Sequence, residues 1–357
     1  MAGSPPLQYT ELMEGLQTKG RVLMLRDRRS DHDVTNTVLV TRWEPVWEAV
    51  HDSFTQLYPG IPLRVLRQAF EDFDNLFRGR MPGYLGCDTV YHDIQHTLDM
   101  TLALGRLIHG HEVSVARDDR LGAPRAILGI ISSLFHDAGY IRHARDEVRR
   151  NGAEFTRSHV TRSAQFLDRY LNQVGLGAAS GIARQIVHYT GYEVRLDQIQ
   201  VVTGKDRKLG QFMGTADLLA QMADRCYLEK CRDRLYPEFV LGGIAVWRDA
   251  SGQVNTRYRS GLDLLRQTPA FFKQVCKPRL DSSFEGAYHY MDAVFEGRNP
   301  YMLAIERNLF YLERVLEGER WPLLRRRPPC ELADQGALER IRRMVAEQLK
   351  ELRAEAA

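Results

Sequence analysis

From Tyr91 to the C-terminus, apolar residues recur at helical spacing in one segment after another, with short polar stretches containing Gly or Pro between them. Residues that recur every three to four positions form one face of an α-helix, and such helices must pack together to bury those faces. The pattern therefore predicts an all-α fold. The expected helices cover residues 92–108, 124–136, 153–170, 178–189, 209–234, 262–273, 284–295, 300–316 and 337–354.

The N-terminal part is less regular. Residues 1–42 are polar, with two short apolar stretches, 22–25 and 38–40, that could form short strands. Two helices are expected after them, at 43–57 and 63–77, followed by a Gly-rich loop at 78–89. We therefore expect an N-terminal extension (1–78), a central helical domain (79–299) and a C-terminal helical extension (300–357).

Charge and composition exclude several classes of protein. The formal net charge is only +3, which does not favour binding to nucleic acid or to an anionic membrane. The longest nearly apolar run, 126–135, is about half the roughly 20 residues that a membrane-spanning helix needs. Five scattered cysteines without Cys-x-x-Cys spacing indicate free thiols. With no targeting pattern in residues 1–20, we expect a cytoplasmic protein.

Histidines and acids fall at the ends of the expected helices. His92 and His96 are four residues apart and share one helix face. Both could bind a metal ion, or one could bind it while the other stays free beside it. Taken alone, such a pair is more often a surface or capping feature.

Two further positions place a carboxylate in apolar surroundings. His136 and Asp137 close the apolar helix expected at 124–136, and Asp217 lies within the apolar stretch FMGTADLL. Burying an unpaired carboxylate costs several kcal/mol, so each needs a partner. A divalent cation would serve both. Backbone N–H groups could serve Asp137 instead, and Arg225 could pair with Asp217.

His159 and His188 complete the set, each on its own expected helix. The intervals from His96 through His136 and these two histidines to Asp217 each correspond to about one helix and its connection. Successive helices of a bundle could thus each supply one ligand to a common metal centre.

These residues carry a resemblance to a known family. The order His96, His136-Asp137, Asp217 is similar to the H…HD…D signature of the HD superfamily of metal-dependent phosphohydrolases. Residues 91–100 (YHDIQHTLDM) resemble the Tyr-His-Asn-x-x-His-Ala-x-Asp-Val motif of class I cyclic-nucleotide phosphodiesterases, and 216–218 resemble their Ala-Asp-Leu. The resemblance covers roughly residues 91–225.

The resemblance implies an HD-domain helical bundle that binds one or two divalent ions. His96, His136, Asp137 and Asp217 would hold the first, and Asp137 would bridge to a second, for which His159 and His188 are candidate ligands. The mixed nitrogen and oxygen donors suit Mn, Zn, Fe, Ni or Co, with Mg at a carboxylate-rich neighbouring site.

The implied reaction is hydrolysis of a phosphodiester or nucleotide-type phosphate ester by a metal-bridging hydroxide, with Asp137 as a catalytic residue. His92 would protonate the leaving oxygen. Gln267 and Phe271 correspond to the residues that clamp a purine in the phosphodiesterases, and Lys205 could contact substrate phosphate. Asp93 stands in place of the motif's Asn, and Tyr140 in place of a second histidine after His-Asp.

Two other functions fit the same residues. Some HD-fold proteins are di-iron oxygenases with six ligands in the order found here, and others are non-catalytic metal-bound sensor modules. His92 favours hydrolysis, because an oxygenase needs no acid for a phosphoryl leaving group. The partner expected is a small phosphate ester, without membrane or specific nucleic-acid binding. The flanking helices could also mediate formation of a homo-oligomer.

Overall fold

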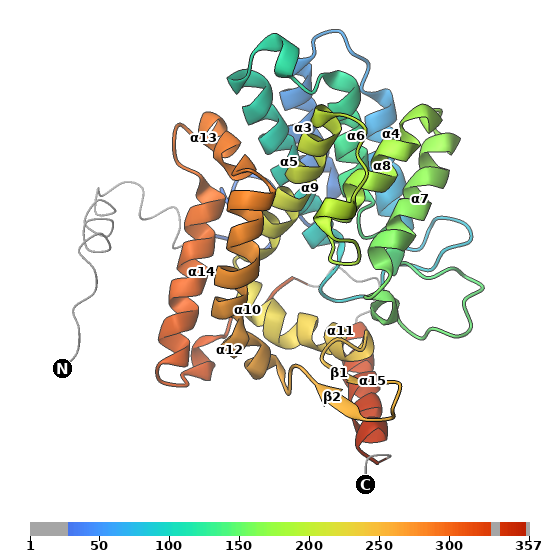
Figure 1. Cartoon of the computed structure of the whole chain (residues 1–357), viewed down its shortest axis with the longest axis vertical. Helices are drawn as coiled ribbons and strands as arrows, with labels where there is room; N and C mark the ends of the chain where they lie inside the picture. The colour runs from blue at the N-terminus through green and yellow to red at the C-terminus, as the bar shows by residue number, and fades with distance from the viewer. Residues whose placement is uncertain (1–27, 330–335, 355–357) are drawn as a thin grey trace, which may run out of the picture.

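Two long helices, α5 (Ile94–Ser114) and α9 (Gly204–Ala223), pack against each other at the centre of the molecule (Figure 1). The computed structural model describes residues 28–329 and 336–354. Buried side chains lie all round α5 and α9, a pattern typical of a helix enclosed by others rather than of a surface helix.

The remaining helices surround this central pair. Helices α3 and α6 pack on α5, α7 packs on α8, and α14 packs on α9, so the chain is mostly helical and the all-α prediction is confirmed. These helices are α3 (Trp43–Leu57), α4 (Arg64–Phe77), α6 (Ala123–Leu134), α7 (His159–Gln173), α8 (Ser180–Ile186), α10 (Tyr227–Lys230), α11 (Tyr236–Leu241), α12 (Gly261–Phe271), α13 (Met291–Val294), α14 (Pro300–Leu316) and α15 (Ala337–Ala354). Short 3-10 and π-helical turns connect several of them.

The strands lie elsewhere than expected. Residues 38–40 form no strand, only a single bridge between His32 and Leu39, and 22–25 lie outside the described residues. Instead β1 (Val246–Arg248) and β2 (Val254–Thr256) form an antiparallel hairpin. Asp249 closes its turn by accepting hydrogen bonds from backbone N–H groups, and Gly252 adopts a positive φ of 85°.

The helix expected at 209–234 is shorter and begins earlier. Thr203 and Asp206 form a capping box that starts α9 at Gly204. At the other end, the Asp224 carboxylate accepts a hydrogen bond from the N–H of Cys226, and this local turn replaces the helical one. The chain then turns through α10, the π-helical η8 (Cys231–Leu235) and α11.

The expected extensions share the core of the central region. One continuous cluster of buried apolar side chains includes Val46 of α3, Phe70 of α4 and Leu312 of α14 together with residues of α5 and α9. The boundaries at 78/79 and 299/300 therefore do not separate hydrophobic cores, and the domain division itself stays a prediction.

The C-terminal helix α15 packs on α11 and on β1. Its Ile341 joins Val90, Ala153 and Leu241 in a small buried cluster, and Gln348 donates a hydrogen bond to the carbonyl of Val240. Helix α15 thus holds α11 through apolar packing and a hydrogen bond. Within the described residues, no helix combines the length and the apolar character needed to cross a bilayer.

A buried ion pair fastens the segment before α3 to α5. Asp33 is fully buried and accepts hydrogen bonds from Thr35, Thr37 and Val38, while the Arg106 guanidinium lies 2.8 Å from it. Burial alone would raise the pKa of Asp33, but Arg106 and these hydrogen bonds lower it to about 2.

We predict that Asp33→Ala lowers the free energy of unfolding by about 3–5 kcal/mol at pH 7, because it removes one partner of a buried pair. Folding lowers the pKa of Asp33, so its charged form stabilises the folded state. This contribution to the free energy of unfolding is complete above the unfolded pKa of about 3.9 and is lost as the pH falls towards 2. Urea denaturation should show the difference from wild type shrinking over that range. Asp52→Ala, at an exposed acid, is the matched control, and an equal loss in both variants would contradict the prediction.

Candidate metal centre and cavity

His96 is positioned by the start of α5. Asp93 is the N-cap, and its Oδ1 accepts a hydrogen bond of 3.0 Å from the backbone N–H of His96. Its Oδ2 lies 3.3 Å from the buried guanidinium of Arg234. Asp93, which stands in place of the motif's Asn, therefore caps α5, and the Arg234 guanidinium compensates its negative charge.

His136 and Asp137 follow the end of α6. The His136 Nδ1–H donates to the carbonyl of Ser133 at 2.7 Å, because a carbonyl oxygen can only accept. In the neutral ring this leaves Nε2 with a free lone pair, which is the form that binds metals. Asp137 begins the 3-10 turn η3 (Ala138–Tyr140).

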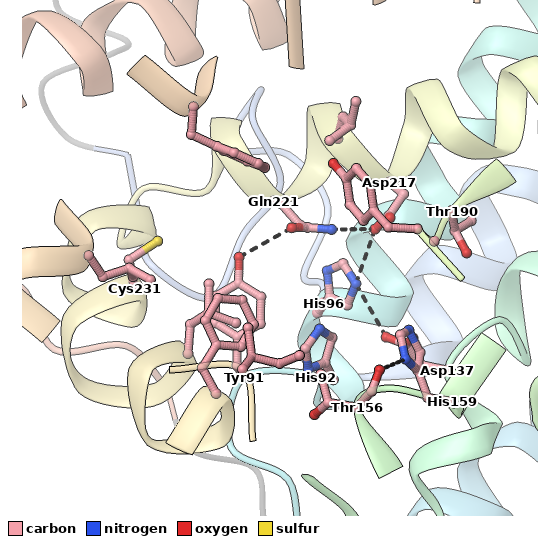
Figure 2. A pocket seen from close by; sticks show the side chains of 18 of the residues that line it. Tyr91, His92, His96, Asp137, Thr156, His159, Thr190, Asp217, Gln221 and Cys231 are labelled. Carbon is pink, nitrogen blue, oxygen red and sulfur yellow. Dashed lines mark hydrogen bonds and ion pairs between the residues drawn. The ribbon is translucent and has the colours of Figure 1, made fainter. Parts of the chain in front are cut away.

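Figure 2 shows the side chains of His96 and Asp137 close to that of Asp217 from α9, and His136 lies within the same group. Oδ2 of Asp137 lies 3.2 Å from Nε2 of His136 and 3.5 Å from Nε2 of His96. Oδ1 of Asp217 lies 3.3 Å from Nε2 of His96 and 3.9 Å from that of His136. The ligand atoms of the His-His-Asp cluster, formed by His96, His136 and Asp137, all lie within 4.8 Å of one another.

This cluster fits a metal ion. Nε2 of His96, Nε2 of His136 and Oδ2 of Asp137 are buried and have no hydrogen-bond partner, an expensive arrangement for polar atoms. Ligands about 2.1 Å from a shared ion lie about 3.0–3.4 Å apart, close to the separations found here. The buried cluster could therefore hold a metal ion.

Asp217 is held in place by a chain of hydrogen bonds. The amide of Gln221 donates to Oδ1 of Asp217 at 2.6 Å, and the Tyr91 hydroxyl lies 3.4 Å from Oε1 of Gln221. The partners of Asp217 are thus His96 and Gln221 rather than Arg225, and Gln221 fixes its orientation as an outer contact of a metal ligand does.

The imidazole and carboxylate groups of the cluster each favour the charged form of the other. Burial alone would lower the pKa of His136, but Asp137 and Asp217 raise it to about 9, so a metal ion that binds Nε2 must displace a proton from it. Burial would likewise raise the pKa of Asp137, yet the neighbouring histidines hold it well below its usual range. Asp137 is therefore a carboxylate, the form in which it can act as a ligand.

Tyr140 lies between two histidine rings. It stacks on His92 with ring centroids 4.5 Å apart and on His159 with centroids 4.4 Å apart. Nδ1 of His159 donates to the carbonyl of Thr156 at 2.7 Å, and its Nε2 lies 3.8 Å from Oδ1 of Asp137. The second oxygen of Asp137 thus faces another imidazole nitrogen.

His92 has a buried carboxylate partner that sequence analysis missed. Its Nδ1–H donates to Oε2 of Glu238 at 2.6 Å, while Oε1 of Glu238 accepts from the N–H groups of Val90 and Tyr91. Burial would lower the pKa of His92, but Glu238 raises it above its ordinary value. This pair favours a protonated imidazole at the edge of the cluster.

A cavity of about 550 Å³ opens beside the cluster. His92, His96, Asp137, His159 and Asp217 line it on one side. Gln267 and Phe271, the substrate-binding residues expected from the resemblance, line it as well.

Three predicted site residues do not line this cavity: His136, which is buried within the cluster, Lys205 and His188. Lys205 is in the first turn of α9, about 18 Å along the helix from Asp217, and donates to the carbonyl of Arg120. This position does not support its predicted contact with substrate, because Lys205, which precedes the helix expected at 209–234, is part of α9 and faces Arg120. His188 lies in η6 (Val187–Tyr189); its Nδ1 is buried without a hydrogen-bond partner, and no ion pair joins it to Asp137. Its role as a ligand stays a prediction.

Glu238 and Gln221 could have been suspected from the sequence only in part. Glu238 lies in the apolar segment YPEFVL, where an acid needs a partner just as Asp217 does. Its partner His92 is 146 residues away, which no local pattern reveals.

No family model, no curated protein and no solved structure matches this chain. The interpretation of the site therefore rests on its own geometry.

We predict that Asp137→Asn reduces divalent-metal affinity by more than the roughly 10–100-fold typical of outer contacts, because it removes a ligand carboxylate. Isothermal titration with Mn²⁺ and Zn²⁺ measures the effect. Asp52→Asn, whose side chain is 78% exposed, should bind as wild type does. Equal affinities for the three proteins would show that the cluster is not the metal site.

Proposed function

We propose that the chain is a metal-dependent phosphohydrolase of the HD type that hydrolyses a phosphodiester or nucleotide-type phosphate ester. The observation that carries this proposal is the buried His-His-Asp cluster with the His92–Glu238 pair beside it, at one side of a cavity. Ligands for a cation and a charged proton donor in one cavity are the parts that phosphate-ester hydrolysis needs.

His96, His136, Asp137 and Asp217 would hold the first ion. The two oxygens of Asp137 face different imidazoles, so this carboxylate and His159 could also serve a second. A bound divalent ion would neutralise charge on the phosphoryl oxygens and lower the pKa of a water molecule. Zn, Mn, Fe, Ni and Co all suit the mixed donors, and Mg suits a carboxylate-rich neighbouring position.

The chain's own residues supply orientation and the proton. Glu238 fixes Nδ1 of His92, so the second proton of the imidazolium is carried at Nε2. Tyr140 packs flat against the same ring and limits its rotation. His92 can therefore deliver a proton to the departing ester oxygen without being a metal ligand itself.

The same observation favours hydrolysis over the two alternatives. A di-iron oxygenase would need His188 as a sixth ligand and has no use for a proton donor held by a buried carboxylate. A sensor module would need no proton donor at all. The His92–Glu238 pair is explained best by a reaction with a leaving group.

The test is hydrolysis of bis(p-nitrophenyl) phosphate by the chain loaded with Mn²⁺, Zn²⁺ or Fe²⁺. We expect turnover that is lost on chelation, and we expect His92→Ala to lower it by about 10²–10⁴-fold, the usual contribution of acid–base catalysis. Metal content, measured by mass spectrometry, should not change in this variant.

His51→Ala is the matched control, because His51 is outside the cavity and exposed. Full turnover in His92→Ala would remove its role as proton donor. Oxygen consumption by the iron-loaded chain without ester hydrolysis would favour the oxygenase.

The pH profile tests Glu238. His92 acts when protonated, so turnover falls as the pH rises through its pKa. Because Glu238 raises that pKa, Glu238→Gln should shift the alkaline fall of kcat/KM to lower pH while metal affinity stays unchanged. An unshifted profile would mean that another group limits the rate at alkaline pH.

A further inference from the structure

The cavity has two chemically different sides. The carboxylates among its described lining residues, Asp137, Glu193 and Asp217, all lie on the side of the cluster. The lining residues between Tyr227 and Val275 come from a later part of the chain and are here called the far wall. In Figure 2, Cys231 of this wall lies well away from Asp137 and His159.

The far wall is apolar and aromatic. Its rings include Tyr227, Phe239, Tyr258 and Phe271, and those of Phe239 and Tyr258 stack with centroids 6.0 Å apart. Burial raises the pKa of the Cys231 thiol to about 12, so this side chain is also uncharged at neutral pH.

Two polar side chains of the far wall already form hydrogen bonds within the protein. Thr268 donates its hydroxyl hydrogen to the carbonyl of Leu264 at 3.0 Å, and the Gln267 amide donates to the carbonyl of Arg257 at 3.2 Å. A polar ligand group placed against these two side chains would have to replace a hydrogen bond that already exists.

The arginines among the described lining residues, Arg157 and Arg257, are both exposed. Arg157 donates to the carbonyl of Gly243 and lies over the ring of Trp247, and Arg257 lies over the ring of Tyr258. A second phosphate group inside the cavity would lose its water without gaining a buried cation on the far wall.

We propose that the substrate carries a single phosphoryl group and an apolar or aromatic ester group that packs on the far wall. This inference rests on the proposed function and narrows its substrate to hydrophobic phosphodiesters, excluding polyphosphates. A diester carries one negative charge, which suits a cavity whose cluster side holds three carboxylates.

The reaction balances with water as the only co-reactant. The water oxygen bonds to phosphorus, the bond from phosphorus to the ester oxygen breaks, and that oxygen takes the proton of His92. The proton released by the water restores His92. The products are a phosphate monoester and an alcohol or phenol, and nothing is oxidised or reduced.

The experiment compares substrates with one leaving group. With the Mn²⁺-loaded chain, p-nitrophenyl phenyl phosphate should show a kcat/KM at least about 10-fold above that of p-nitrophenyl methyl phosphate, as expected for added apolar groups in an apolar pocket. ATP should be hydrolysed more slowly than either. Faster hydrolysis of ATP, or equal values for the phenyl and methyl esters, would overturn the proposal.

Phe271→Ala should reduce the ratio of kcat/KM for the phenyl ester to that for the methyl ester towards one. Phe310→Ala, at a phenylalanine 43% exposed outside the cavity, should preserve this ratio.

A binding measurement distinguishes failure of this inference from failure of the proposed function. If no ester is hydrolysed, the proposed function fails. Tighter binding of phenylphosphonate than of methylphosphonate by at least about 10-fold would still support the apolar wall, and equal binding would refute it.

Discussion

The structure depends on the burial of imidazole and carboxylate groups where α5, α9 and the end of α6 meet. These helices must be central, because their apolar residues leave no face for solvent. His96, His136, Asp137 and Asp217 are therefore carried into the interior with the helices that bear them. Removing such groups from water is costly unless a partner compensates them, and a shared cation could compensate two imidazole nitrogens and two carboxylates together. The proposed chemistry follows from this requirement.

The contacts outside the cluster are as specific as those within it. Ser133 and Thr156 each hold one nitrogen of a histidine through a backbone carbonyl, so that the other nitrogen faces the site. Gln221 orients Asp217, and Glu238 orients His92. These partners determine which atom of each side chain can bind or donate, which is why these four residues belong to the site although none of them is itself a proposed ligand.

Much of the helical framework could be predicted from the sequence. The expected helices at 43–57, 300–316 and 337–354 coincide with α3, α14 and α15, because amphipathic spacing defines a surface helix well. Convergence of His96 with His136 and Asp137 was also expected and is confirmed.

The predicted bounds of α9 were wrong because a capping box and a local turn, rather than apolar spacing, set them. The β1–β2 hairpin was missed because strands of three residues leave almost no periodic signal. The Glu238 partner was missed because pairing across the chain is a property of the fold.

The packing of α15 on α11 links the chemistry to a distant part of the chain. Glu238 lies in α11, and Ile341 and Gln348 of α15 contact Leu241 and Val240 of that short helix. A preparation clipped ahead of α15 would retain every candidate metal ligand, yet the support for the His92 acid would be weakened. Under the proposed function, such material would stay fully metallated while turning over slowly, so metal occupancy would overstate the fraction of competent enzyme.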